Sequence, residues 1–434
     1  MSPAMMGTIG ILVMFVLLVL RVPVAFAMFS VGFVGITILD SSRSALSLLA
    51  SETFTLASSP ELVVIPLFIL MGNVASETGM SRKLYDAAYA IIGQFRGGLA
   101  SATVIGCGGF AALSGSSVAS ALTMGKVALG QMDRFKYNTR LSTGVVAAGG
   151  TLGILIPPST GFVIYAILTE QSIGRLFLAG VLPGIMLLLL FIFVIMLICW
   201  FRPEFGPAGP ATSWRNKGKA LLGAGPIIAV ILLSIGGIYS GLFSPVEASA
   251  VGAGIVILVG LITRVLSLNA LWRAARDAVV TTATVMLILI AAHLINPFMA
   301  LSHIPAAVGE LLSGLGLGVT GTLILILAIY LVLGCFLEGF AMLVLTLPIF
   351  FPIIMALGID PIWFGVLTVL TLEMGLISPP VGINVFIVKS VAPNVELGDI
   401  FRGVLPFWLM MVLAVALLIL FPQIVLFLPN TMFG

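Results

Sequence analysis

Apolar runs dominate the chain and follow the same order in its two halves. A membrane-spanning helix takes about 20 apolar residues, and most of the runs approach or exceed that length. The first half contains runs near 5–20, 23–39, 62–76, 98–130, 141–168 and 176–200. The second half contains runs near 221–240, 245–263, 278–296, 317–356, 361–388 and 404–428. Shorter mixed stretches also repeat, 40–60 with 264–277 and 81–96 with 304–316. The pattern predicts an all-α polytopic membrane protein.

One offset relates the two halves. The chain has two Pro-Pro dipeptides, Pro157-Pro158 and Pro379-Pro380, and they lie 222 residues apart. The same offset relates Pro23-Val24 to Pro245-Val246, Gly32 to Gly254, Gly153 to Gly375 and Val163 to Val385. A single register that runs from the first helix pair to the last indicates an internal duplication. We therefore predict a first repeat over residues 1–220 and a second over 221–434.

The fourth and fifth runs of each half depart from simple spanning helices. Runs 98–130 and 317–356 are too long for one span and are rich in glycine at the centre. We predict that each is a hairpin that enters the membrane and leaves on the same side. Non-helical backbone is tolerated at that depth only where protein or a water-filled cavity surrounds it. Runs 141–168 and 361–388 contain the Pro-Pro dipeptides, which remove backbone donors and break the helix.

The number of crossings determines how the repeats are oriented. Each half is predicted to hold about five full crossings plus one re-entrant hairpin, so the number of crossings per half is odd. The second repeat is then inverted relative to the first. Inverted repeats with broken helices near the membrane midplane are typical of secondary transporters.

The composition agrees with this membrane class. Of 434 residues, 60% are hydrophobic and 8% are charged, against roughly a quarter charged in soluble domains. A soluble enzyme, a nucleic-acid-binding protein and a disordered chain are excluded, because too few polar residues are present to cover a soluble core. The main surroundings of the chain are a lipid bilayer, and nucleic acid is not expected as a partner.

The few basic residues orient the chain. When the crossings alternate, 17 of the 19 Lys and Arg residues fall on one side, and Arg43 and Arg175 fall on the other. Basic residues mark the cytoplasmic side of a membrane protein. Both termini are thus predicted to be periplasmic, with the first hairpin open to the cytoplasm and the second open to the exterior.

Polar residues at the first hairpin tip form one candidate site. Ser114-Gly115-Ser116-Ser117 is expected to face Gly153, Pro157 and Ser159 at the first helix break. Freed carbonyls and hydroxyls are hard oxygen ligands of the kind that small cations prefer. The start of the second hairpin arm presents N–H groups that suit an anion. The alternative is that the serines cap helices and the glycines allow close packing.

A second candidate site lies at the corresponding place in the second half. It combines Glu338-Gly339 at the hairpin tip with Gly375, Ser378-Pro379 and Asn384 at the second break. A carboxylate at membrane depth is costly and is by default functional. Glu338 could bind a cation or exchange a proton, or it could cap the second hairpin arm. Glu373, one turn before the break, ranks lower because pairing with a neighbouring helix would also explain it.

Long ordered strings resemble a known family over nearly the whole chain. They are VIPLFILMGNVASETGMSRKLY (64–85), SGSSVASALTMG (114–125), GTLGILIPPS (150–159), SPVEASAVGA (244–253), LEGFAMLVLTLPIFFPI (337–353) and GLISPPVGINVFI (375–387). The sequence resembles the large membrane subunit of tripartite ATP-independent periplasmic (TRAP) transporters, within the ion-transporter superfamily. The resemblance implies an elevator-type transporter in which the hairpins and broken helices move against the other helices.

The resemblance also implies a function and partners. It implies Na⁺-coupled import of an organic anion, such as a C4-dicarboxylate or a sugar acid, across the bacterial inner membrane. The implied partners are a periplasmic substrate-binding protein and a small four-helix membrane subunit, which is expected to be a separate polypeptide. Na⁺ is implied as the coupling ion, with no other cofactor and no transition metal.

The resemblance to the family also implies roles for individual residues. The implied first Na⁺ site consists of Ser114, Gly115, Ser116, Gly153 and Pro157. The implied second Na⁺ site consists of Glu338, Gly339, Gly375, Ser378 and Pro379. The implied substrate or coupling positions are Ser116, Ser117, Ser159, Glu338 and Asn384. Glu338 departs from the family pattern, in which Asp is the commoner acid, and its extra methylene alters its reach.

Three alternatives remain open at this stage. A stand-alone divalent-anion/Na⁺ symporter would share the hairpins and repeats and would work without partners. An anion channel on the same scaffold would carry an uncoupled current. An intramembrane enzyme would need a catalytic dyad or a metal set at depth, and the sequence shows neither, so we expect no enzymatic activity. The sequence also lacks a P-loop, which leaves ATP-driven transport unsupported.

Overall fold

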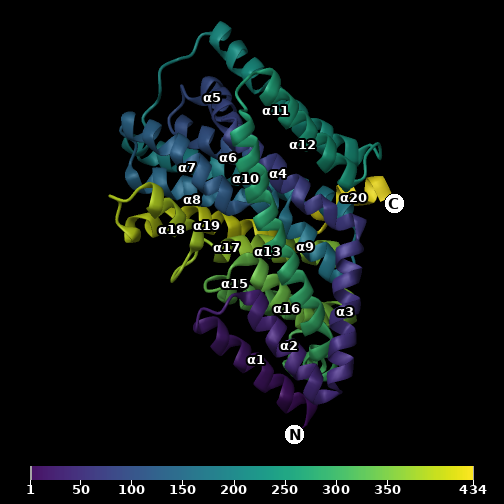
Figure 1. The fold of residues 1–434 in the computed structure, drawn as a ribbon. Coiled ribbons are helices and arrows are strands. Elements are labelled where there is room, and N and C mark those ends of the chain that lie inside the picture. Colours follow the sequence, from purple (N-terminus) through teal and green to yellow (C-terminus); the bar gives the residue numbers. More distant parts are fainter. Residues whose placement is uncertain (1, 434) are drawn as a thin grey trace.

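The computed structural model describes residues 2–433, and the regular elements in that range are helices (Figure 1). Within this range, 8 helices are long and apolar enough to cross a membrane. Shorter apolar helices, including Pro3–Val19 and Val24–Leu39, add to them. The all-α polytopic class predicted from the apolar runs is confirmed.

The helices of the first half follow the predicted runs closely. In chain order they are α1 (Pro3–Val19), α2 (Val24–Leu39), α3 (Ser42–Ser58), η1 (Pro60–Val63), α4 (Val64–Glu77), α5 (Met80–Ile92), α6 (Gly98–Ser114), α7 (Ser117–Arg134), α8 (Thr139–Leu155), α9 (Thr160–Thr169), α10 (Ile173–Phe201) and η2 (Pro203–Phe205). Helices α6 and α7 form the first hairpin, and α8 and α9 form the first broken helix.

The second half repeats this order. Its helices are α11 (Trp214–Tyr239), α12 (Pro245–Ile262), α13 (Leu268–Leu301), α14 (Ile304–Gly314), α15 (Gly318–Gly334), α16 (Gly339–Ala356), α17 (Pro361–Gly375), α18 (Ile383–Val391), α19 (Leu397–Leu420) and α20 (Gln423–Phe433). Helices α15 and α16 form the second hairpin, and α17 and α18 form the second broken helix.

Proline placement explains two differences from the predicted runs. The mixed stretch 264–277 and the run 278–296 were expected as separate elements, but α13 joins them in one helix of 34 residues. In the first half Pro60 interrupts the matching segment between α3 and α4, whereas Thr282 stands at the equivalent position. The run 404–428 was expected as one element, but the chain turns at Phe421-Pro422 and divides it into α19 and α20.

The hairpins and broken helices pack on one another, and those of the first half lie deep in the protein. Helix α7 packs on α8, α15 on α17 and α16 on α9, while α13 packs on α2 and α4, and α4 packs on α12. Most side chains of α6 and α8 are buried. In contrast, α10 and α19 expose apolar side chains such as Trp200 (79% exposed) and Leu420 (69% exposed). The irregular backbone of the first break is therefore surrounded by protein, and regular helices supply apolar surface suited to lipid.

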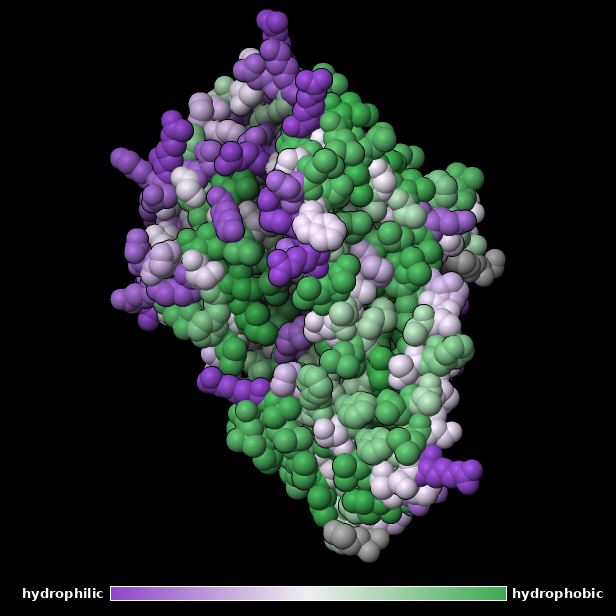
Figure 2. Space-filling view, viewed as in Figure 1, coloured by the Kyte–Doolittle hydropathy of each residue, from purple (hydrophilic) through white to green (hydrophobic). Residues whose placement is uncertain are grey.

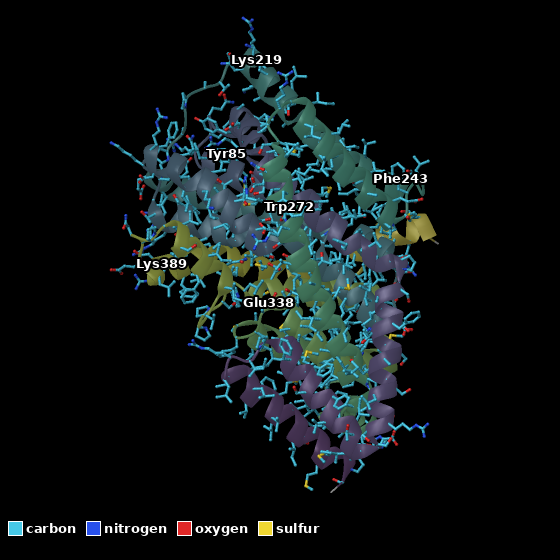
Figure 3. The ribbon with its side chains drawn as sticks, viewed as in Figure 1. Tyr85, Lys219, Phe243, Trp272, Glu338 and Lys389 are labelled. Carbon is cyan, nitrogen blue, oxygen red and sulfur yellow. The ribbon has the colours of Figure 1, made fainter. Side chains whose placement is uncertain are left out.

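Charged side chains gather at one end of the molecule. Figure 2 shows the hydrophilic surface concentrated over the upper left, and Figure 3 places Lys219 and Lys389 at that end. Phe243 lies at the opposite edge of the view, in the loop between α11 and α12. The charges that the sequence assigns to one face thus lie together in space.

Candidate functional site

The first hairpin turns through a single glycine. Gly115 ends α6 with φ of 58°, a left-handed conformation that glycine adopts at no steric cost. The next residue, Ser116, is the N-cap of α7, and its hydroxyl accepts a hydrogen bond from the amide N of Ala119 at 3.3 Å. A cap of this kind satisfies one of the free amides at the start of a helix. The capping alternative for Ser116 is therefore realised in this arrangement.

The first helix break frees backbone oxygens. Pro157 and Pro158 stand four residues after Gly153 and Ile154, so these two carbonyls lose the amide donors of a continuous helix. Ser159 then begins α9, with its hydroxyl accepting from the amide N of Phe162 at 3.3 Å. Both prolines and Ser159 are buried. The break thus places carbonyl oxygens inside the protein next to a helix N-terminus.

The first hairpin tip is tied to the first break. The hydroxyl of Thr160 donates to the carbonyl O of Gly115 at 2.7 Å. A Cβ atom added to Gly153 would lie 2.5 Å from the carbonyl O of Ser116. The two backbones therefore touch, and only glycine fits at position 153 without a shift. Ser114 at the tip is also held, with its Oγ 3.1 Å from Oγ of Ser120.

The second hairpin tip approaches the second break through glycines. A Cβ atom on Gly375 would lie 2.6 Å from backbone atoms of Gly334, and one on Gly339 would lie 2.7 Å from the Leu372 side chain. Glu338 stands at the N-cap of α16, and its exposed carboxylate makes no capping bond within the described residues. Figure 3 shows Glu338 near the centre of the view. The capping role considered for this side chain is absent from this arrangement.

At the second break, the backbone carbonyls accept hydrogen bonds from amides of the same segment. The amide N of Ser378 donates to the carbonyl O of Gly375 at 3.0 Å, and the amide N of Asn384 donates to that of Leu376 at 3.0 Å. The Ser378 hydroxyl donates to the carbonyl O of Met374 at 2.6 Å and accepts from Trp408 Nε1 at 2.9 Å. Pro379 is exposed, unlike Pro157 in the first break. The second break is thus more open than the first and internally bonded.

One contact joins the two half-sites directly. The hydroxyl of Ser117, the first residue of α7, donates to Glu373 Oε1 at 2.6 Å. Glu373 lies on α17, two residues before its end, and is completely buried. Sequence reasoning ranked Glu373 below Glu338, although a carboxylate at membrane depth was the available signal. Only the fold shows that its partner is the first hairpin tip.

The structure brings most of the predicted positions together in two groups. The first group is Ser114, Gly115, Ser116, Ser117, Gly153, Pro157 and Ser159, at the first tip and break. The second group is Glu338, Gly339, Gly375, Ser378 and Pro379, at the second tip and break. Asn384 is the second residue of α18 and is fully buried, whereas the prolines of the break are exposed.

Comparisons with known proteins agree with this architecture. Residues 11–424 match the family described as "Tripartite ATP-independent periplasmic transporter, DctM component". The C4-dicarboxylate TRAP transporter large permease protein DctM of Pseudomonas aeruginosa is 39% identical over 408 residues, covering 92% of this chain and 94% of the relative. The ectoine TRAP transporter large permease protein TeaC of Halomonas elongata is 31% identical over 429 residues, covering 99% and 100%.

A solved structure has the same fold. The YdaH transporter of Alcanivorax borkumensis, described as having an unusual topology, aligns with a TM-score of 0.62 at 15% sequence identity. The alignment covers 88% of each chain. At this identity the likeness concerns the fold alone. The family match spans nearly the full length, and the chain therefore belongs to the DctM component family of tripartite ATP-independent periplasmic transporters.

Proposed function

We propose that the chain is the large subunit of a tripartite system that imports an organic anion across the bacterial inner membrane, driven by a Na⁺ gradient. The observation that carries the proposal is the pairing of each hairpin tip with a proline-broken helix, through Gly115 with Thr160 and Gly334 with Gly375. Such discontinuous helices place ion and substrate sites near the membrane midplane in secondary transporters. Membership of the family supports transport as the activity.

The broken helices supply ligands for Na⁺. The carbonyls of Gly153 and Ile154 lack their helical donors, and the hydroxyl of Ser114 lies at the tip that covers them. Carbonyl and hydroxyl oxygens suit a hard cation. The proposed first Na⁺ site is Ser114, Gly115, Ser116, Gly153 and Pro157. The proposed second site is Glu338, Gly339, Gly375, Ser378 and Pro379.

Helix N-termini favour an anionic substrate. Helices α7, α9, α16 and α18 all begin at the hairpin tips or the breaks. Their first amides and positive dipole ends favour carboxylate groups. We assign substrate or coupling roles to Ser116, Ser117, Ser159, Glu338 and Asn384. A C4-dicarboxylate is favoured by the name of the Pseudomonas relative, whereas the ectoine relative indicates that family membership alone leaves the substrate open.

We further propose that the two hairpins and broken helices move as one body against α2, α4, α12 and α13. The hairpins and broken helices pack on one another. Helix α13 packs on α2 and α4, and α4 packs on α12. A periplasmic binding protein would deliver the substrate, and a separate small membrane subunit would support the stationary helices. The charge distribution favours periplasmic termini.

Uptake by reconstituted protein tests the proposal. The chain and its small subunit are placed in liposomes, and uptake of a labelled C4-dicarboxylate is measured with the binding protein outside. We expect uptake only when an inward Na⁺ gradient and the binding protein are both present. Potassium in place of Na⁺ is the matched control. Uptake without the binding protein would favour a stand-alone symporter, and an uncoupled anion current would favour a channel. Either result would contradict the proposal.

A further inference from the structure

The first residues of α11 project from the rest of the protein. Buried side chains on this helix begin only at Ala224, although the helix starts at Trp214. A Cβ atom added to Gly218 or Gly223 would meet no other atom within 4 Å. Figure 3 places Lys219 at the upper tip of the molecule. We call residues 214–219 the α11 extension, and the protein leaves most of its side chains exposed.

The length of α11 places the extension at the membrane surface. About 20 apolar residues span the hydrocarbon core of a bilayer, whereas α11 has 26 residues. The segment 220–239 is long enough to cross the core, and it ends at Tyr239, an aromatic residue of the kind found at membrane–water interfaces. The extension therefore lies beyond the core, at the level of the lipid phosphates, on the side that the basic residues mark as cytoplasmic.

Positive charge is concentrated in the extension. Arg215, Lys217 and Lys219 are exposed, and the extension contains no acidic residue. Its charge of +3 equals the formal net charge of the whole chain, so the rest of the chain is neutral in sum. The ion pairs within residues 2–433 join other side chains. The three basic groups are thus free to bind an anion from outside the protein.

An indole ring lies beside these charges. Trp214 is 86% exposed, and Nζ of Lys217 lies 4.9 Å from the centroid of its ring. Tryptophan favours the membrane interface, because its ring is apolar while its N–H needs a polar partner. Further along the helix, Leu222 is 80% exposed and continues the apolar surface into the core. The surface thus matches the two parts of a phospholipid, an acidic headgroup and an apolar chain.

We propose that the α11 extension binds the headgroup of an anionic phospholipid in the cytoplasmic leaflet. The phosphate oxygens accept hydrogen bonds from Arg215, Lys217 and Lys219, and an acyl chain lies along Leu222. Basic clusters next to a spanning helix attract anionic headgroups by charge complementarity. Lysine is depleted at protein–protein interfaces, so a lipid fits this face better than a second membrane subunit does. The proposal concerns how the chain is held in the membrane and holds for any transported substrate.

Native mass spectrometry of the chain purified with its small subunit tests the proposal. Binding of phosphatidylglycerol is compared with binding of phosphatidylcholine, whose headgroup has no net charge. We expect the wild type to bind phosphatidylglycerol about tenfold more tightly. The site variant, in which glutamine replaces all three basic residues of the extension (Arg215→Gln, Lys217→Gln and Lys219→Gln), should lose this preference. Equal binding of the two lipids by the wild type would overturn the proposal.

A matched variant separates the site from the general charge of the cytoplasmic face. It replaces one arginine and two lysines that are exposed around the end of α7, namely Lys126→Gln, Arg134→Gln and Lys136→Gln. We expect it to prefer phosphatidylglycerol as the wild type does. The same loss of preference in both variants would contradict a site on α11. A site variant that keeps the lipid preference and instead loses the small subunit would show that the face is a protein contact, and would also overturn the proposal.

Quenching of tryptophan fluorescence places the lipid on the helix. In vesicles of phosphatidylglycerol and phosphatidylcholine, bromine atoms on the acyl chains of one lipid quench the indoles beside it. We expect stronger quenching when the bromine is on phosphatidylglycerol. The difference should shrink severalfold in Trp214→Phe and persist in Trp272→Phe, which changes a 72% exposed ring on α13. An unchanged difference in Trp214→Phe would contradict the proposed position.

Discussion

The two half-sites share a backbone plan but are held together in different ways. In the first, Ser159 caps α9, and Thr160 binds the hairpin carbonyl of Gly115 at 2.7 Å. In the second half-site, the positions 222 residues later are Val381 and Gly382, and neither residue has a hydroxyl group. Its carbonyls at Gly375 and Leu376 are satisfied within the break itself. The first break is also buried, whereas the prolines of the second are exposed.

This difference between the half-sites shows that two kinds of residue have different roles. Prolines and glycines determine where the helices break and how closely the backbones approach, and these are repeated. The side chains beside them determine whether a tip is tied to its break, and these are not repeated. We therefore expect the first half-site to be ready to bind a cation as it stands. The second has to release its internal hydrogen bonds before its carbonyls can bind one.

The largest effect is expected from Gly153→Ala. The new Cβ would lie 2.5 Å from the carbonyl O of Ser116 and would push the first tip away from its break. Overpacking of this kind costs about 1–3 kcal/mol, so Na⁺-driven uptake should fall about tenfold or more. Gly254→Ala on α12 is the control, since a Cβ atom there meets open space. Similar uptake by both variants would contradict the close contact.

Removing the hydrogen bond between Thr160 and Gly115 should raise the Na⁺ concentration that uptake requires. Thr160→Val deletes the hydroxyl that binds the Gly115 carbonyl and leaves a buried acceptor without its donor, at a cost of about 1–3 kcal/mol. We expect half-maximal uptake to require severalfold more Na⁺. Thr160→Ser keeps the hydroxyl and should behave like the wild type. If Thr160→Ser is as impaired as Thr160→Val, packing of the methyl group is the cause.

Two acids should separate function from stability. Glu338→Ala removes an exposed carboxylate with no capping bond in the described structure, so uptake should fall severalfold while the melting temperature stays the same. Glu247 completes a capping box with Ser244, with its Oε2 2.8 Å from the Ser244 amide N. Glu247→Ala should therefore lower the melting temperature and leave uptake per folded protein unchanged. Equal losses of uptake in both variants would count against a coupling role for Glu338.

The smallest effect is expected from the cap of α9. Ser159→Ala removes the hydroxyl that accepts from Phe162 and should destabilise the protein by about 1 kcal/mol. Val381→Ala changes the matching position of the second break, where the side chain is 36% exposed, and should have a smaller effect. Thermal unfolding in detergent measures both. A larger loss for Val381→Ala would reverse the proposed difference between the breaks.

Much of the fold could be predicted because the physical signals are local. The apolar runs and Pro-Pro dipeptides predict the hairpins α6–α7 and α15–α16 and the breaks after Leu155 and Gly375. It was harder to predict that two neighbouring segments would join in one helix. Helix α13 is such a case, because the second half has no proline at the position equivalent to Pro60.

The candidate site was less predictable where it depends on contacts between distant residues. The residues at each tip and break could be named from their types and spacing. The bond between Ser117 and Glu373 joins residues 256 positions apart and depends on how α7 packs near α17. Likewise, nothing local shows that Thr160 reaches Gly115 or that Glu338 leaves its helix uncapped. The first of these bonds follows from packing between the halves, and the contact of Thr160 with Gly115 follows from packing of the hairpin on the broken helix within one half.

Sodium binding to the purified complex tests the central claim most directly. Equilibrium binding of radioactive Na⁺ is measured for the wild type, Gly153→Ala and Gly254→Ala without a membrane gradient. We expect saturable binding by the wild type and by Gly254→Ala, and severalfold weaker binding by Gly153→Ala. No saturable binding by the wild type, or equal binding by all three proteins, would contradict a Na⁺ site at the first hairpin tip and break.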